Sequence, residues 1–236
     1  NTLYQLLAVK RDRPELLEAA DQLLMIPDLV HWLLSGQRSN ERTIASTTQC
    51  FNPQSGQWAS DLLTQFGIPT ELFRSVSEPG HDIGSIRSDI ASDTGLGDVR
   101  VVLPGSHDTA SAVAAVPALE PPSSRPDWCY ISLGTWALVG AELDWPLVTP
   151  ECLAHNFTNE GGVGGTTRLL KNLCGLWLVQ QCRVSWQRSG NNWNWDQLTA
   201  LAAESAPLQT IIDSGHPSLV APNDMPQAIR ELAQQS

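Results

Sequence analysis

The sequence lacks an excess of basic residues. It has 14 Lys and Arg against 25 Asp and Glu, a formal net charge of −11, and no basic run interrupts this balance. Binding to a nucleic-acid backbone needs positive surface charge. A nucleic-acid partner is therefore not expected, and the acidity favours solubility.

The sequence also has few cysteines and no long apolar run. The five cysteines are an odd set without Cys-x-x-Cys spacing, which argues against both a disulfide framework and a zinc knuckle. No stretch reaches the ~18 apolar residues of a membrane span, and no basic and then apolar leader opens the chain. We expect reduced thiols, a cytoplasmic location and no association with membranes.

A length of 236 residues with 42% hydrophobic residues is enough for a substantial core. The sequence starts at Asn1, without Met, inside the helix-like run TLYQLLAV, and it stops just after a second such run, MPQAIRELAQ. We therefore expect this chain to be a piece of a longer protein.

The first part of the chain reads as helices, a β-rich segment and a loop. Residues 14–35 predict two helices separated at Pro27, residues 43–51 are β-rich, and residues 58–67 predict a helix that ends at Gly67. Residues 75–97 read as a loop with a short strand at most, which makes them a candidate domain boundary.

From Asp98 the pattern changes to alternating strands and helices. Residues 99–104 predict a strand, 105–108 a turn and 109–116 a helix. Two hairpins follow, over 128–140 and 154–170, and then helices over 171–187, 195–205 and 225–234, the first with Leu173, Leu176, Trp177 and Val184 near one face. This alternation indicates the α/β class.

His107, Asp108 and Thr109 lie where the predicted strand turns into the helix, a position that faces the ligand crevice in open α/β sheets. The alternative is that Asp or Thr is an ordinary helix N-cap. In the first hairpin turn, the backbone of Gly134 and the hydroxyl of Thr135 can meet a phosphate, or the two residues are only a turn.

Three other features have an ordinary explanation beside the functional one. Gly161, Gly162, Gly164 and Gly165 lack the third glycine of a dinucleotide fingerprint and open no helix, so they favour a hairpin turn. The stretch 168–172 offers the cations Arg168 and Lys171 and the amide of Asn172, which meet a polyol or a phosphate or are only solvated. The nine tryptophans are predicted to pack in the core. They are Trp32, Trp58, Trp128, Trp136, Trp145, Trp177, Trp186, Trp193 and Trp195.

Five segments taken together resemble the FGGY family of carbohydrate kinases. They are NTLYQLLA, LLMIPDLVHWLLSG, GSHDTASAVAAVP, YISLGTWALVG and NFTNEGGVGGTTRLLKNLCGLWLVQQC. The resemblance covers most of residues 1–190 and thins beyond, although LVAPNDMPQAI still matches. NTLYQL and NFTNEGG look particular to the branch that phosphorylates L-rhamnulose.

The resemblance implies an actin-like, ribonuclease-H-like sugar kinase fold of two α/β domains, which this chain contains incompletely. Residues 1–97 would be the C-terminal part of the first domain and residues 98–236 the N-terminal part of the second. The family's chains are about twice as long. The Asp-Gly phosphate turn, the sugar contacts of the first domain and the adenosine segment would lie outside this chain, so we expect this chain alone to be inactive.

The resemblance also implies ATP-dependent phosphorylation of L-rhamnulose at its 1-hydroxyl, with magnesium as cofactor, in rhamnose catabolism. Asp108 would be the catalytic base. His107, Asp108, Thr109 and Asn172 would contact the sugar, and Gly134, Thr135 and Gln180 would contact ATP. No residue of this chain is expected to bind a metal directly.

Three rival hypotheses remain. The first is an FGGY kinase for another ketose or polyol, and the second is a non-catalytic remnant that binds a sugar or nucleotide. The third is a metal phosphohydrolase that uses His81, His107 and Asp108 with a distant Asp. Those enzymes are all-helical, whereas residues 99–104 predict a strand before the His-Asp pair.

Overall fold

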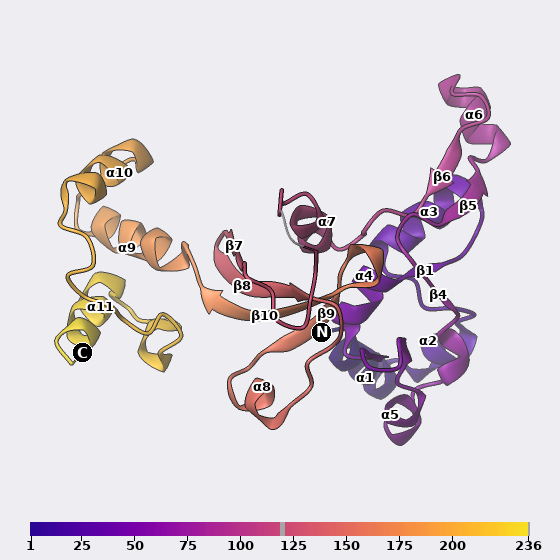
Figure 1. Ribbon diagram of the computed structural model, residues 1–236, viewed down its shortest axis with the longest axis horizontal. Helices are drawn as coiled ribbons and strands as arrows, with labels where there is room; N and C mark the ends of the chain where they lie inside the picture. The colour runs from indigo at the N-terminus through magenta and orange to yellow at the C-terminus, as the bar shows by residue number, and fades with distance from the viewer. Residues whose placement is uncertain (119–120, 236) are drawn as a thin grey trace. The chain divides into compact units, whose positions relative to one another are not determined.

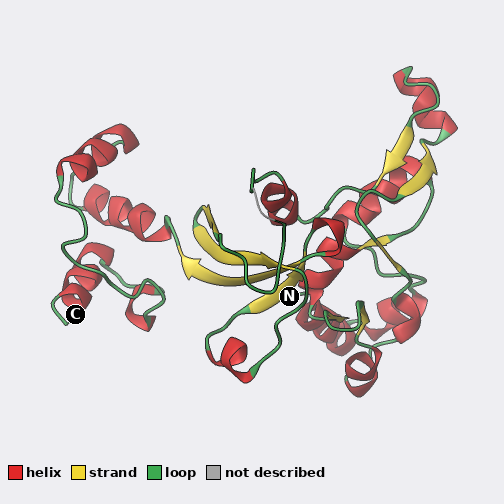
Figure 2. Cartoon of the chain, viewed as in Figure 1, coloured by secondary structure: helices red, strands yellow, loops and turns green. Residues whose placement is uncertain are grey.

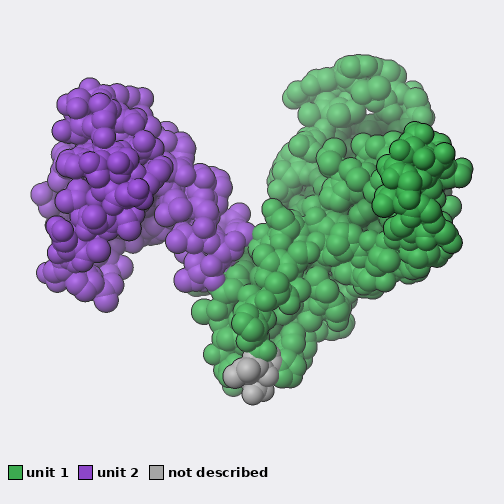
Figure 3. All heavy atoms as spheres, turned by 90° about the horizontal axis from the view of Figure 1, so that it is seen from above, with its two compact units in different colours: residues 1–130, 140–170 green, residues 131–139, 171–236 purple. Residues whose placement is uncertain are grey.

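A computed structural model describes residues 1–118 and 121–235. The chain mixes helices and short strands (Figure 1, Figure 2) and divides into two compact units, coloured separately in Figure 3. Unit 1 comprises residues 1–130 and 140–170, and unit 2 comprises residues 131–139 and 171–236. Within the described residues, no helix is long and apolar enough to cross a membrane.

The helices of the described residues are α1 (Thr2–Asp12), α2 (Pro14–Ala19), α3 (Ile26–Ser35), α4 (Arg42–Ala45), α5 (Ser60–Gln65), α6 (Ser88–Thr94), α7 (Asp108–Ala114), α8 (Pro150–Ala154), α9 (Trp177–Arg188), α10 (Trp195–Glu204) and α11 (Met225–Ala233). Short 3-10 helices lie at η1 (Ser46–Thr48), η2 (Thr70–Leu72), η3 (Val163–Gly165) and η4 (Pro217–Leu219).

The strands are β1 (Asn40–Glu41), β2 (Phe51–Asn52), β3 (Gln57–Trp58), β4 (Val76–Ser77), β5 (Asp82–Ser85), β6 (Arg100–Val102), β7 (Tyr130–Leu133), β8 (Trp136–Leu143), β9 (Thr158–Gly161) and β10 (Thr167–Cys174). The largest sheet has the order β7-β8-β10-β9, and β9 and β10 are antiparallel. Both predicted hairpins are therefore present. The glycine cluster lies in the turn of the second one, where Gly164 and Gly165 have φ of 76° and 81°.

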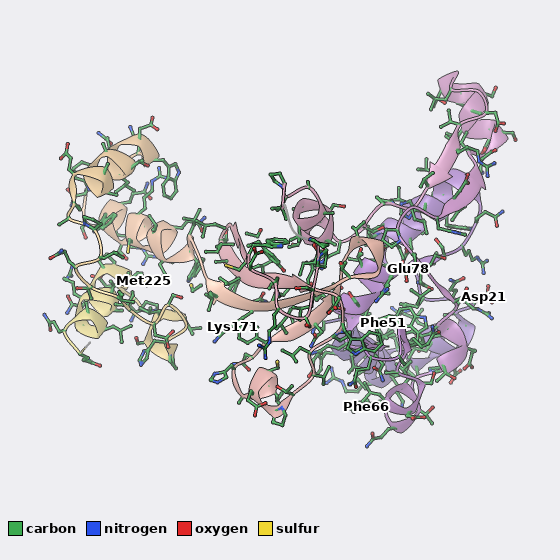
Figure 4. The ribbon with its side chains drawn as sticks, in the orientation of Figure 1. Asp21, Phe51, Phe66, Glu78, Lys171 and Met225 are labelled. Atoms are coloured by element: carbon green, nitrogen blue, oxygen red, sulfur yellow. The ribbon has the colours of Figure 1, made fainter. Side chains whose placement is uncertain are left out.

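The apolar core of unit 1 forms where α1 meets the segment 50–73. Leu3 and Leu6 lie one turn apart on α1 and are buried, as are Leu63 and Leu72. Trp58 packs edge-on against Phe73, with ring centroids 5.0 Å apart. Phe51, on β2, contributes to the same unit (Figure 4).

Two predictions for the first part of the chain need correction. Pro27 lies in the first turn of α3 and so begins that helix rather than separating two long ones, because a proline there needs no amide partner. The segment 43–51 is mostly helical rather than β-rich. The carboxylate of Glu41 accepts hydrogen bonds from the backbone amides of Thr43 and Ile44 and so starts α4.

The segment 75–97 contains more structure than a loop. It forms β4, β5 and α6, and β5 pairs with β6 in an antiparallel ribbon with α6 at its end (Figure 1). The strand, turn and helix predicted for residues 99–116 are present as β6 and α7. The ribbon joins residues on both sides of Gly97. It does not mark a boundary at 97/98, which stays a prediction.

Unit 2 contains a small core to which α9 and α11 contribute. The helix predicted from Lys171 starts only at Trp177, because residues 171–174 continue β10 in the sheet, so Leu173 does not lie on its face. Cys182 of α9 packs with Leu219 and with Met225 of α11 (labelled in Figure 4). Helix α11 starts as predicted, with the Asp224 side chain accepting a hydrogen bond from the Gln227 amide.

Burial varies among the tryptophans and among the cysteines. Trp136 and Trp145 are each 65% exposed, so the prediction that the tryptophans are core residues is wrong for these two, and Trp193 and Trp195 are also exposed. Trp195 instead lies under the guanidinium of Arg183, 4.8 Å from its ring centroid. All five cysteines are free thiols, and Cys50 and Cys182 are buried.

Candidate active site

Asp108 opens α7 directly after β6 and the turn 103–107. Its side chain is 95% exposed, while Thr109 behind it is buried. The Asp108 carboxylate accepts hydrogen bonds from the Thr109 amide at 2.6 Å and the Thr109 hydroxyl at 3.3 Å. The N-cap position belongs to His107. The interpretation of Asp108 as the N-cap is therefore wrong by one position, and its carboxylate is presented outward.

The backbone before Asp108 is held by the start of α4. The carboxylate of Glu41 accepts the Ser106 amide at 3.0 Å, and the Thr43 hydroxyl accepts the His107 amide at 3.0 Å. Both Glu41 and Thr43 are fully buried. Since buried hydrogen bonds to a carboxylate are strong and costly to lose, these contacts fix where α7 begins.

A second buried carboxylate supports Glu41 from behind. Asp28, on α3, accepts the Glu41 amide at 3.0 Å and the Asn40 side-chain amide at 3.4 Å. Burial raises the pKa of Asp28 to about 6, against the lowering contribution of these hydrogen bonds. The turn that presents Asp108 is thus linked to α3 through buried polar contacts.

His107 contacts a buried ion pair. Nη2 of Arg168 lies 2.7 Å from Nδ1 of His107 and donates to Glu160 at 3.0 Å, while Nε of Arg168 donates to the Gly161 carbonyl at 3.2 Å. The Arg168 side chain is fully buried. The interpretation of Arg168 as a cation that meets a ligand is therefore wrong. Its donors are directed inside the fold, toward His107 and β9.

The surroundings keep His107 neutral. Burial lowers the pKa of His107 below its ordinary value, and the neighbouring Arg168 lowers it further, while Glu160 and Asp108 act in the opposite direction. Tyr130, buried close to Arg168, has its pKa raised to about 12 by burial, so its hydroxyl stays protonated. His107 therefore presents an uncharged imidazole beside the Asp108 carboxylate.

In unit 2, Thr135 and Gln180 are brought together. The side-chain amide of Gln180 donates to the Thr135 hydroxyl at 3.4 Å. The turn is anchored on the start of α9, because the Thr135 carbonyl accepts the Gly175 and Trp177 amides at 3.2 and 3.1 Å. A Cβ on Gly175 would lie 2.6 Å from the Gly134 carbonyl oxygen, so glycine is required for this approach.

The backbone of Gly134 is already engaged. Its amide donates to the Trp136 carbonyl at 2.9 Å, and its own carbonyl accepts the Leu176 amide at 2.8 Å. These existing hydrogen bonds do not favour a contact between the Gly134 backbone and ATP. The role of Gly134 as an ATP contact stays a prediction. Asn172 is exposed on β10, and the neighbouring Lys171, labelled in Figure 4, is partly exposed. Both remain available to a ligand.

The described residues contain no group of three or more His, Cys, Asp or Glu side chains placed to hold a metal ion. A pocket of about 230 Å³ lies in unit 1 and is lined by Arg42, Glu78, Asp144, Trp145 and others. Neither His107 nor Asp108 lines it. The residues that line this pocket therefore do not link it to the Asp108 carboxylate.

Two domain models of one protein family match this chain. Residues 1–115 match the N-terminal domain, and residues 129–236 the C-terminal domain, of the FGGY family of carbohydrate kinases. The chain belongs to the FGGY family of carbohydrate kinases. The family expected from the five segments is thus confirmed, and the all-helical metal phosphohydrolase is not supported. The first FGGY match extends past Gly97, and the expected boundary at 97/98 is not tested by it.

Relatives in the FGGY family come from several bacteria. A rhamnulokinase of Bacteroides thetaiotaomicron is 42% identical over 98% of this chain and 46% of its own length. A rhamnulokinase of Halalkalibacterium halodurans is 36% identical over the whole chain and 48% of its own length. The chain spans about half the length of these curated relatives.

The fold is also that of FGGY kinases. The structure of a xylulose kinase from Lactobacillus acidophilus matches with a TM-score of 0.70 at 18% identity, over 87% of this chain and 40% of the other. This likeness confirms the predicted actin-like, ribonuclease-H-like sugar kinase fold, present here in part.

Sequence reasoning missed the residues that hold the site from behind, including Glu41 and Glu160. Glu41 and Glu160 hold Ser106 and Arg168, and neither was singled out. Glu160 lies inside the NFTNEGG stretch. Glu41 precedes Thr43 by two residues, a spacing that allows a local side-chain cap. The sequence around Glu41 does not indicate its partner Ser106, which is 65 residues away. The sequence around Glu160 does not indicate its partner Arg168, which lies on the next strand.

Proposed function

We propose that this chain supplies part of the active site of an ATP-dependent kinase that phosphorylates L-rhamnulose at its 1-hydroxyl. The observation that carries the proposal is the exposed carboxylate of Asp108, beside the neutral imidazole of His107, in an FGGY kinase chain. The rhamnulokinases among its relatives support the choice of sugar.

Asp108 acts in this proposal as the general base. A sugar hydroxyl is a weak nucleophile near neutral pH, and a carboxylate within hydrogen-bond reach accepts its proton. The hydroxyl oxygen then forms a bond to the γ-phosphorus of ATP while the bond from that phosphorus to the β,γ-bridging oxygen breaks. The products are the sugar 1-phosphate and ADP, and the proton resides on Asp108.

The other predicted contacts take supporting roles. His107, Thr109 and Asn172 offer polar groups to the sugar, and Thr109 also donates to the Asp108 carboxylate. The Thr135 hydroxyl and the Gln180 amide offer polar groups to ATP. Magnesium, held largely by phosphate oxygens and water, would neutralise charge on the transferred phosphoryl group.

We further propose that residues 1–97 belong to the first kinase domain and residues 98–236 to the second. The FGGY matches to an N-terminal and a C-terminal domain support two domains. The proposed boundary lies before the strand and helix that present Asp108.

The test is an assay of the complete protein that carries this chain, with ATP and a panel of ketoses and polyols. We expect ADP formation with L-rhamnulose and identification of the product as the 1-phosphate by NMR. A clear preference for another sugar would change the proposed substrate and leave the proposed kinase activity in place. Sugar and ATP binding without turnover by the complete protein would favour the non-catalytic alternative.

A further inference from the structure

The fully buried Arg168 contacts the turn 103–107 in addition to its neighbouring strand. Its guanidinium reaches from β10 to the Gly161 carbonyl and the Glu160 carboxylate on β9, and also to Nδ1 of His107. The first two contacts join neighbouring strands. The third one joins the sheet to the residue that precedes Asp108.

This third contact determines which nitrogen of His107 carries the proton. A guanidinium has only donors, so Nδ1 of His107, 2.7 Å from Nη2 of Arg168, accepts through its lone pair. In a neutral imidazole the proton then lies on Nε2. Nε2 of His107 is 3.6 Å from the Asp108 carboxylate, which is longer than a hydrogen bond. This N–H is therefore available to a ligand beside Asp108.

The charged groups around the ring favour the same state. Glu160, on β9, is 3.4 Å from Nδ1, and Asp108 and the buried Glu41 also face the imidazole. These carboxylates favour protonation, whereas burial and Arg168 oppose it, and the outcome is a lowered pKa for His107. Removing the guanidinium would leave burial as the opposing contribution and so favour the carboxylates more.

We propose that Arg168 is a positioning residue for the kinase reaction, which fixes His107 in the tautomer protonated on Nε2 and so presents an N–H donor to sugar oxygens beside Asp108. This proposal rests on the proposed function. A purely structural Arg168, which only joins β9 to β10, would stabilise the fold without setting the tautomer.

The first test reads the tautomer directly in the complete protein labelled with ¹⁵N-histidine. Long-range ¹H–¹⁵N spectra distinguish the two tautomers, and His107→Gln assigns the signals. Because the pKa of His107 lies below its ordinary value, we expect a single Nε2-protonated form of His107 near neutral pH. In Arg168→Gln we expect mixed tautomers and a raised pKa of His107, because Glu160 is no longer paired.

The second variant separates positioning from folding. Arg168→Gln/Glu160→Gln removes both charges, so it avoids a buried unpaired carboxylate and still leaves the Nδ1 atom without its guanidinium donor. We expect this variant to fold, judged by circular dichroism, and to show mixed tautomers of His107. A folded double variant that keeps the single Nε2-protonated form would overturn the proposal.

Kinetics supply the third readout. With L-rhamnulose, we expect Arg168→Gln to lower kcat by about 10–100-fold, as for a misoriented catalytic group. The KM for ATP should stay unchanged, and the acid limb of the pH profile should move to higher pH. The matched control is Arg42→Gln, which removes a guanidinium paired with Glu78, 3.0 Å away, and should keep the tautomer and kcat.

The two proposals fail in different ways. A wild-type protein without sugar kinase activity overturns the proposed function, whatever its histidine spectrum. An active wild-type protein whose Arg168→Gln variant keeps both the tautomer and kcat overturns only the positioning role of Arg168.

Discussion

The carboxylate of Glu41 accepts the backbone amide of Ser106 at 3.0 Å, although the two residues are 65 positions apart in the sequence. The same carboxylate accepts the Thr43 amide at 2.7 Å and the Thr43 hydroxyl at 2.6 Å. One buried acidic side chain thus starts α4 and fixes the turn that presents Asp108. Asp108 is exposed, and the residues that place it are not.

The first prediction concerns Glu41→Gln. A glutamine amide would direct N–H groups toward backbone amides that need an acceptor, so we expect a loss of about 1–3 kcal/mol in the free energy of unfolding. We also expect lower kcat with L-rhamnulose, because the turn before Asp108 shifts. Urea unfolding and steady-state kinetics measure both effects. Glu78→Gln, which removes an exposed carboxylate paired with Arg42, is the control and should change neither.

The second prediction concerns Asp108→Asn. His107 rather than Asp108 occupies the N-cap, and the Asp108 side chain is exposed, so thermal stability should barely change. The amide cannot accept the hydroxyl proton, and phosphoryl transfer should slow by about 10²–10⁴-fold while sugar binding largely survives. Single-turnover phosphorylation and a melting curve test this pair of outcomes.

Asp89→Asn is the matched control for Asp108→Asn. Asp89 also lies in the first turn of a short helix and pairs with Arg87 on the surface. Its substitution should leave the rate of phosphoryl transfer unchanged. A stable Asp108→Asn variant with a near-normal rate would remove Asp108 from the mechanism.

The third prediction concerns Thr135→Val. Valine keeps the β-branched shape but removes the hydroxyl that accepts from Gln180, so we expect a loss of about 1–3 kcal/mol in transition-state stabilisation through weaker handling of ATP. Kinetics with varied ATP and varied sugar locate the effect. Thr199→Val, whose hydroxyl donates to a backbone carbonyl within α10, is the control. Unchanged kinetics in both substrates would assign Thr135 to the turn alone.

The fourth prediction concerns Gly175→Ala. The new Cβ would lie 2.6 Å from the Gly134 carbonyl oxygen and 2.8 Å from the Ala137 nitrogen, both of which are backbone atoms. We expect destabilisation of about 1–3 kcal/mol, since the turn must separate from the start of α9. Chemical unfolding measures this loss. Gly134→Ala, whose Cβ would meet only one atom at 3.5 Å, should be tolerated, and equal stability of the two variants would contradict the close approach.

The fifth prediction concerns the chain of 236 residues by itself. We expect no ATP-dependent phosphorylation of L-rhamnulose, because the chain spans only 46% and 48% of the two rhamnulokinases compared above, and the resemblance places further sugar and adenosine contacts elsewhere. A coupled assay for ADP, with the complete protein as positive control, measures this. Sustained turnover by the chain alone would show that residues 1–236 suffice.

Local sequence predicted the elements whose patterns are short-range. The strand and helix that flank Asp108, both hairpins, the glycine turn and the start of α11 at Asp224 are present as expected, because turn chemistry, capping and period-2 or period-3.6 patterns act over a few residues. Five ordered segments were also enough to identify the family. The sequence predicts the end of the second hairpin at residue 170, whereas β10 continues to Cys174. This continuation depends on the neighbouring strands in the sheet.

The tertiary structure decided which side chains are directed inward. From the sequence, Arg168 is a cation near a hairpin end and Asp108 is a candidate N-cap. In the fold Arg168 is fully buried against Glu160 and His107, and Asp108 follows the cap and is exposed. Hydrogen bonds such as Glu41 to Ser106 and His107 to Arg168 join residues more than 60 positions apart. No local pattern encodes them, because burial and pairing depend on distant segments that fold against each other.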